Sequence, residues 1–248
     1  MRLHTVLPLA YLMMFACTCG LADDAEPKWG HLKGRIVLDG EIPKLQPLVK
    51  AAPGFGNIPD ESLVVDKATK GIANVVVYLQ KKPAAIHPEL LKSKDPNVKF
   101  QAIGGRYDPH VLLARTDQQV EVSTPDAVAY NVHTYPLKNL QENFVCAPGP
   151  VSLNLSLSER LPVKVGCDKH PWMLAWWVVL DHPYAAITGK DGSFEIKNLP
   201  VGEHDFTVWQ EKVGYIRPTE TEKFYKVPIA ADETTSLEVT VPVSIYPR

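Results

Sequence analysis

The sequence has no long run of charge of either sign. Its 248 residues include 26 Lys and Arg against 28 Asp and Glu, which gives a formal net charge of −2. Nucleic-acid-binding domains carry clustered basic side chains that neutralise phosphates. The sequence therefore predicts no nucleic-acid partner.

Long apolar runs are also scarce. Residues 5–17 form a sustained apolar stretch, but it is shorter than the roughly 20 residues that a membrane-spanning helix needs. Arg2 precedes this stretch and small residues end it at Ala22, which is the pattern of a secretory signal. We therefore expect residues 1–22 to be a signal peptide. The mature protein would be exported, periplasmic or extracellular, without a transmembrane segment; a lipoprotein anchored at Cys17 is the less favoured alternative.

Cysteine is rare, with four in the whole chain. Removal of the signal peptide would leave Cys146 and Cys167. Two cysteines in an exported protein commonly form a disulfide, whereas a metal ligand needs a free thiolate. A disulfide and a metal role for Cys167 therefore exclude each other, and we expect two free thiols.

Motifs of familiar catalytic sites are missing. The sequence has no nucleophile elbow, no phosphate-binding loop and no recognisable pair of catalytic carboxylates. We therefore expect that the protein is not an enzyme.

The chain does contain many short apolar segments that are typical of strands. Runs rich in Val, Ile and Leu, bounded by Pro, Gly, Asp or Asn, predict strands at 32–38, 72–79, 111–115, 120–123 and 151–157. Residues 237–243 alternate between apolar and polar, as a half-buried strand does. The 22 prolines disfavour long helices, and only residues 87–93 suggest a short one. The predicted fold class is all-β, built from two β-sandwiches.

Two distant segments look like halves of one module. The first is "LKGRIVLDGEIP" at 32–43, continued by "IANVVVYLQ" at 72–80. The second is "YAAITGKDGSFEIKNLPVGEHDFTVWQEKVGY" at 184–215, in which an Asp-Gly pair predicts a hairpin turn. These patterns resemble the carboxypeptidase regulatory-like, or transthyretin-like, β-sandwich. The resemblance implies a discontinuous domain at 31–82 and 184–248, with residues 98–183 inserted as a second domain.

The stretch "GCDKHPWM" at 166–173 carries the strongest chemical signal. It places a thiol, an imidazole and a thioether three residues apart, at Cys167, His170 and Met173. Alternating valines predict a strand before it, and residues 175–180 predict another after it. Such a loop suits one copper ion, because thiolate and imidazole form strong bonds and a thioether forms a weak axial one.

This loop resembles the ligand loop of the cupredoxins, the blue copper proteins of the amicyanin and plastocyanin type. The upstream run "YDPHVLLARTDQQVEVSTPDAVAYNVHTY" at 107–135 resembles another segment of that family. The resemblance covers residues 98–183 and implies a Greek-key sandwich. It also implies bound copper and one-electron transfer with a redox partner protein.

One position departs from the family. Cupredoxins take a histidine ligand from "HNV", but this sequence reads Tyr130-Asn131-Val132-His133. In a regular strand Tyr130 and His133 point to opposite faces, so His133 could join the site only through a bulge. Imidazole is a better copper ligand at neutral pH than a phenol, whose pKa is about 10. We therefore expect His133 as a metal ligand, with Tyr130 as the alternative and His110 as a further source.

The sequence supports three functions. The first is an exported copper protein that transfers electrons. The second is a copper-handling protein without redox cycling, because a Cys, His and Met set that lacks a fourth ligand suits Cu(I). The third is a metal-free structural sandwich protein that recognises a carbohydrate or a protein partner.

Overall fold

The computed structural model describes residues 27–247, so the expected signal peptide at 1–22 lies outside the described residues. Within that span almost all regular structure is β-strand, and the two helical turns are 3-10 turns, η1 (Pro88–Leu90) and η2 (Val243–Ile245). The prediction of an all-β fold is confirmed. No helix among the described residues is long and apolar enough to cross a membrane.

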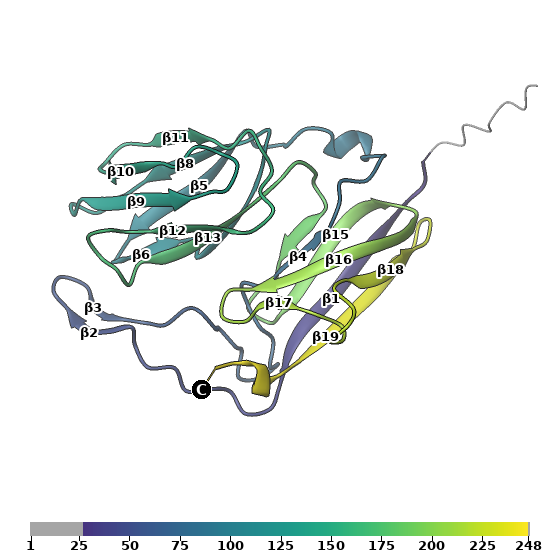
Figure 1. Ribbon diagram of the computed structural model, residues 1–248, viewed down its shortest axis with the longest axis horizontal. Helices are drawn as coiled ribbons and strands as arrows, with labels where there is room; N and C mark the ends of the chain where they lie inside the picture. Colours follow the sequence, from purple (N-terminus) through teal and green to yellow (C-terminus); the bar gives the residue numbers. More distant parts are fainter. Residues whose placement is uncertain (1–26, 248) are drawn as a thin grey trace, which may run out of the picture.

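Strands from both ends of the described chain build one sandwich, which we call the outer sandwich (Figure 1). Its first sheet has the order β15 (Ser193–Pro200), β1 (Trp29–Asp39), β19 (Thr234–Pro242). Its second sheet has the order β14 (Ala185–Ile187), β4 (Val76–Leu79), β16 (Gly202–Gln210), β17 (Gly214–Ile216), and β18 (Tyr225–Ile229) also pairs with β16. Because β1 is antiparallel to β15 and parallel to β19, segments far apart in the sequence share one sheet.

Alternation along β1 explains how the outer sandwich closes. Leu32 and Ile36 are fully buried in its core, whereas Lys33 between them is exposed. Gly34 lies on the same buried face, where a Cβ atom would come 2.0 Å from the carbonyl oxygen of Leu237. Glycine therefore permits the close approach of β1 to β19.

Residues 97–180 build a second sandwich, which we call the central sandwich (Figure 1). One sheet has the order β10 (Asn143–Cys146), β9 (Tyr130–Tyr135), β12 (Val163–Gly166), β13 (Leu174–Leu180), β7 (Val111–Arg115). The other has the order β11 (Val151–Asn154), β8 (Gln119–Ser123), β5 (Asn97–Ile103), β6 (Arg106–Asp108). Between the sheets Phe100 packs edge-on against Trp177, with ring centroids 4.9 Å apart. The candidate ligand loop belongs to this sandwich.

The two sandwiches share an apolar contact. Val76 and Trp209 of the outer sandwich are buried in one cluster with Val178 of the central sandwich. Trp176 packs edge-on against Trp209, with ring centroids 5.4 Å apart. β4 is therefore buried on both faces, which explains its uninterrupted apolar sequence.

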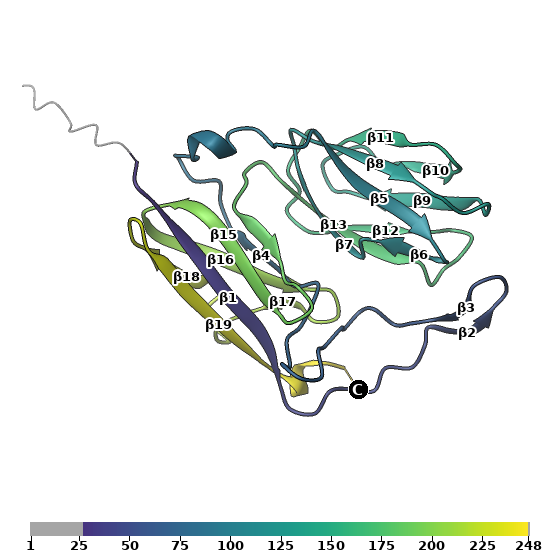
Figure 2. The ribbon, with the colours of Figure 1, turned by 180° about the vertical axis from the view of Figure 1, so that it is seen from behind.

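The connection between β1 and β4 carries a small hairpin of β2 (Val49–Ala52) and β3 (Gly56–Ile58), which we call the arm. Figure 2 shows the arm extending from the outer sandwich toward the end of the central sandwich near β6. The ring of Phe55 in the arm lies 6.1 Å from that of Tyr130 and 5.6 Å from that of His170. The arm therefore brings an N-terminal segment onto the candidate ligand loop.

Candidate metal centre

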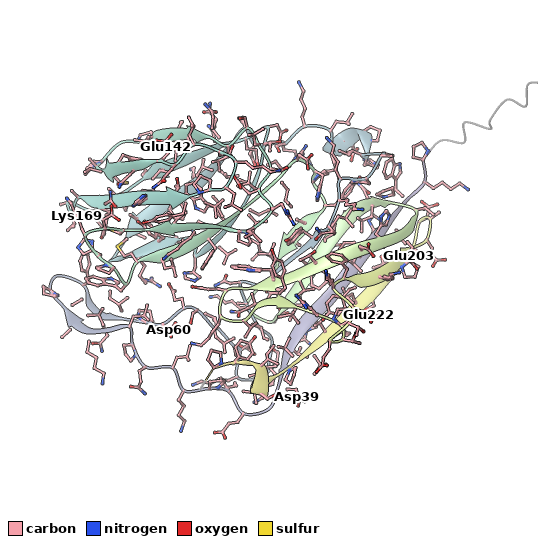
Figure 3. The ribbon with its side chains drawn as sticks, in the orientation of Figure 1. Asp39, Asp60, Glu142, Lys169, Glu203 and Glu222 are labelled. Carbon is pink, nitrogen blue, oxygen red and sulfur yellow. The ribbon has the colours of Figure 1, made fainter. Side chains whose placement is uncertain are left out.

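The loop at 167–173 connects two neighbouring strands of one sheet. Cys167 directly follows β12, and Met173 directly precedes β13. A hydrogen bond of 2.8 Å from the backbone N–H of Met173 to the carbonyl oxygen of His170 folds the loop into a turn. Figure 3 marks Lys169 of this loop at the end of the central sandwich. As the sequence predicted, a short loop between strands carries all three candidate donors.

The thiol and the imidazole lie close together. The Cys167 Sγ atom is 3.6 Å from the Nδ1 atom of His170, and it accepts a hydrogen bond of 3.4 Å from the backbone N–H of Asn131. Two ligands of one tetrahedral ion, with metal–sulfur bonds of about 2.3 Å and metal–nitrogen bonds of about 2.0 Å, lie roughly 3.6 Å apart. The observed separation fits a shared metal ion. It also fits a hydrogen bond between a thiol and an imidazole.

Asn131 holds the loop against β9 and β10. Its side-chain Oδ1 accepts a hydrogen bond of 2.9 Å from the backbone N–H of Asp168. Its Nδ2 donates to the Asn143 Oδ1 at 2.6 Å and to the Phe144 carbonyl oxygen at 3.2 Å. These bonds fix the residue that follows Cys167, and outer contacts of this kind orient metal ligands.

Tyr130 fills the space beside the His170 imidazole but offers no atom that is free to bind a metal. Its side chain is fully buried, and its ring centroid lies 5.7 Å from that of His170. Its hydroxyl donates to the Asp126 carboxylate and accepts a hydrogen bond of 3.1 Å from the backbone N–H of Gly105. Burial, together with the bond to Asp126, raises the pKa of Tyr130 to about 12. The phenol is therefore neutral at physiological pH, and its oxygen is already bonded elsewhere.

The structure places His133 outside this group, whereas the sequence analysis expected it to join the site. That prediction required a bulge, but the described pairing of β9 with β10 and β12 continues through His133 without one. Strand alternation therefore turns His133 to the face opposite Tyr130. There its Nδ1 lies 3.0 Å from the Asp168 Oδ1, and its ring stacks on Tyr135 with centroids 4.2 Å apart.

His110, the further candidate, also has another partner. Its Nε2 pairs with the Glu211 carboxylate, where the two sandwiches meet. Burial lowers the pKa of His110, but the hydrogen bond and charge of Glu211 outweigh that effect and leave the pKa raised. This pair holds the sandwiches together and does not supply the missing ligand.

Both cysteines of the described chain are free and buried. Cys146 lies on β10 opposite Tyr130, and burial raises the pKa of its thiol. The disulfide alternative is therefore excluded in this structure. Cys167 keeps a thiol that can bind a metal.

Three aromatic rings enclose His170. The ring centroids of Phe55, Tyr130 and Trp172 lie 5.6, 5.7 and 5.1 Å from that of His170. Burial, together with the nearby charge of Lys169, lowers the pKa of His170. The imidazole is therefore neutral at neutral pH, which is the state that binds metals.

The sequence analysis did not anticipate the supports around these rings. Gly105 sits in a turn with a φ of +72°, which favours glycine. Its N–H donates to the Tyr130 hydroxyl, and its carbonyl oxygen accepts a hydrogen bond of 3.1 Å from the Trp172 indole. The pair Gly104-Gly105 was the available signal, since it predicts a tight turn, but a turn alone does not reveal these partners.

A cleft opens beside the loop. It has a volume of about 360 Å³, and both Cys167 and Met173 line it. Part of its wall comes from the arm and from the segment that carries Asp60, which Figure 3 shows below the central sandwich. An ion carried by a small molecule or a partner protein could therefore reach the loop.

Few metal-binding side chains meet at this loop, and two of them bind through sulfur. Among the described residues, no three His, Cys, Asp or Glu side chains are grouped so that they could hold a metal ion. Of the three such side chains in the loop, Cys167 and His170 lie close together, whereas Asp168 turns to His133. The buried thioether of Met173 belongs to the same apolar cluster as Cys167. Thiolate and thioether sulfurs favour Cu(I) over harder ions. The residues present fit a monovalent copper ion better than a divalent one.

Comparisons with known proteins find similar structures but no family. No protein-family model matches the chain, and no curated protein matches it in sequence. An oxidised amicyanin mutant is similar at 18% identity and a TM-score of 0.30, over 35% of this chain and 85% of that chain. A reduced amicyanin mutant is similar at 17% identity and a TM-score of 0.31, over 43% of this chain and 98% of that chain.

The copper-containing nitrite reductase of Thermus scotoductus is similar at 18% identity and a TM-score of 0.29, over 40% of this chain and 25% of that chain. These neighbours are cupredoxins, but similarity at this level assigns neither a ligand nor a function. Each match covers less than half of this chain. The carboxypeptidase regulatory-like assignment of the outer sandwich stays a prediction.

Proposed function

We propose that the protein is an exported copper-handling protein that binds one Cu(I) ion through Cys167, His170 and Met173. The ion is cargo, which the protein receives and passes on. The observation that carries this proposal is the 3.6 Å approach of the Cys167 Sγ to the His170 Nδ1 beside a Tyr130 that cannot serve as a ligand. No catalysed reaction is part of the proposal.

The chemistry of the donors favours Cu(I) over Cu(II). Cu(II) prefers several nitrogen or oxygen ligands in a tetragonal arrangement, whereas Cu(I) accepts two or three soft ligands. Tyr130 is neutral and bonded to Asp126, and His133 faces the other side of β9. A site with one imidazole and two sulfurs would therefore hold the reduced ion selectively.

Electron transfer is less well supported for the same reason. Cycling between two copper states requires ligands that serve both, and the site lacks a second imidazole. In place of a redox partner, we expect a protein or small molecule that exchanges Cu(I) through the cleft lined by Cys167 and Met173.

The test is a Cu(I) titration of the mature protein without oxygen, in competition with a chromogenic Cu(I) chelator. The wild type should bind one ion per chain. Cys167→Ala should weaken binding by more than the roughly 10–100-fold that loss of an outer contact costs. Cys146→Ala is the matched control, since it removes the other buried free thiol of the same sandwich, and it should bind like the wild type.

Equal binding by the two variants, or no binding by the wild type, would overturn the proposal. The second result would leave the short Cys167–His170 approach as a hydrogen bond within a metal-free sandwich.

A further inference from the structure

The face of the outer sandwich that meets the central sandwich is only partly covered. Trp209 on β16 is buried in the contact between the sandwiches. Tyr215 pairs with Trp209, and Tyr78 pairs with Thr207, so all four side chains lie on the same face of the sheet. Beside Tyr78 and Tyr215 the sandwiches part and leave a second cleft of about 360 Å³. This volume falls within the roughly 300–1,000 Å³ of small-molecule sites.

The second cleft is lined mainly by positive charge. Its basic side chains are Lys82, Lys138, Arg160, Arg217 and Lys223. None of the five forms an ion pair within residues 27–247. Two carboxylates, Asp181 and Glu159, also line the cleft. Five positive charges against two give this cleft a net charge of +3, in a chain whose formal net charge is −2.

One of the two carboxylates, Glu159, is already hydrogen-bonded to the backbone. The Glu159 oxygens accept hydrogen bonds of 2.9–3.2 Å from the backbone N–H groups of residues 137–139. These bonds fix the loop that carries Lys138 at the edge of the cleft. Few carboxylates of the protein are therefore left to neutralise the positive charges of the cleft. A concave site lined by one sign of charge concentrates ligands of the opposite sign.

The distribution of the charges indicates an extended anion. Lys82 follows β4, Lys138 follows β9, Arg160 follows β11, and Arg217 and Lys223 lie between β17 and β18. A compact ion would contact only a few of these side chains. A ligand that carries several anionic groups along its length could contact segments of both sandwiches.

The remaining lining suits a polyhydroxylated ring. Tyr215 is 38% exposed and lines the cleft, so its flat ring can contact a ligand. Gln80 and Ser158 supply amide and hydroxyl groups. His182 also lines the cleft, but it is buried, and its Nδ1 already accepts a hydrogen bond of 3.3 Å from the backbone N–H of Tyr184. Burial lowers the pKa of His182 to about 4, so this imidazole adds no charge to the cleft.

We infer that this second cleft binds an acidic oligosaccharide, whose sugar units carry carboxylate or sulfate groups. The inference does not depend on copper. Among the described residues, the second cleft shares no lining side chain with the cleft that reaches Cys167 and Met173.

The test is isothermal titration calorimetry of the mature protein with a galacturonate tetramer and a heparin-derived tetrasaccharide. Cellotetraose serves as the neutral comparison, and tripolyphosphate serves as a compact anion. At a salt concentration of about 0.15 M, where long-range attraction is largely screened, at least one acidic sugar should bind more tightly than both comparison ligands. Failure of both acidic sugars to bind would overturn the inference.

Paired variants locate the binding. Arg217→Gln with Lys223→Gln should weaken binding at least about tenfold, because each lost side chain removes charge-assisted hydrogen bonds. Lys67→Gln with Lys190→Gln removes the same charge from exposed positions outside the cleft and should leave affinity unchanged. Equal losses in the two double variants would mean that attraction is non-specific and would contradict the inference.

Two variants of one side chain separate a sugar from a compact anion. Tyr215→Ala should weaken binding of the acidic sugar, whereas Tyr215→Phe, which keeps the ring, should not. If tripolyphosphate binds as tightly as the sugars and Tyr215→Ala has no effect, the cleft is a phosphate site and the sugar assignment is wrong. Thermal unfolding of each variant verifies that it is folded.

Discussion

Replacing Tyr130 with histidine should change which copper state the site accepts. The substitution places an imidazole beside the Cys167 thiol and the His170 ring, where the structure now has a neutral phenol ring. Two imidazoles and a thiolate form a set that binds Cu(II) as well as Cu(I). We therefore expect Tyr130→His to bind Cu(II) with an intense thiolate-to-copper absorption band, which the wild type should lack.

The substitution should also reduce the stability of the metal-free protein. It removes the hydroxyl that donates to the Asp126 carboxylate and accepts from the backbone N–H of Gly105. Asp126 keeps a hydrogen bond of 2.7 Å from the backbone N–H of Gly104, so the main loss is the buried acceptor for Gly105. An unsatisfied buried group costs about 1–3 kcal/mol, and the smaller ring leaves additional space in the core. A loss of roughly 2–4 kcal/mol in the free energy of unfolding follows.

The assay combines absorption spectra after Cu(II) addition with urea unfolding of the metal-free protein. Tyr130→Phe is the control, because it removes the same hydroxyl but adds no donor. It should lose only the part due to the unsatisfied N–H of Gly105, about 1–3 kcal/mol, and gain no absorption band. If Tyr130→His shows no change in Cu(II) binding while remaining folded, Tyr130 does not occupy a ligand position, and the reasoning about this site fails.

Three further predictions concern residues around the site and the second cleft. His133→Ala should leave Cu(I) affinity unchanged in the chelator titration, since His133 faces away from the thiol; a large loss would restore it as a ligand. Phe55→Ala should speed transfer of Cu(I) to a chelator in stopped-flow measurements, because it removes a ring that covers His170; an unchanged rate would mean that the arm does not limit access. Glu159→Gln should cost about 1–3 kcal/mol at pH 7 in urea unfolding. Although burial raises the pKa of Glu159, hydrogen bonds from backbone N–H groups leave it lowered, so this contribution is present above the unfolded pKa of about 4.5 and is lost as the pH falls through the folded value. Equal losses at pH 7 and at a pH where Glu159 is protonated in the folded protein would contradict that assignment.

Local sequence patterns predicted most of the strands. The apolar run at 111–115 is the strand Val111–Arg115, because alternation and bounding turn residues are local properties of the chain. The run at 72–79 forms a named strand only at Val76–Leu79. Asn74 interrupts it with a φ of +60°, and an apolar run does not reveal such a break.

The loop with Cys167, His170 and Met173 was also predictable, because its donors are close in the sequence. The direction of His133 could not be read from the sequence in the same way, because the expected bulge rested only on the need of a copper ion for another ligand. The continuous pairing of β9 shows that strand alternation prevailed.

Contacts between distant segments could not be predicted. Phe55 reaches His170 from a hairpin that belongs to the connection between β1 and β4. Trp176 and Trp209 meet across the two sandwiches. Side-chain periodicity states which face of a strand is buried, but it does not state which partner buries it.

X-ray absorption at the copper edge tests the central claim most directly. In the protein loaded with one Cu(I) ion, we predict sulfur scattering from Cys167 and Met173 together with nitrogen scattering from one imidazole. The sulfur contribution should fall in the Cys167→Ala variant and persist in Cys146→Ala. A copper environment of nitrogen and oxygen alone, or one unchanged by loss of Cys167, would contradict a Cu(I) site at this loop.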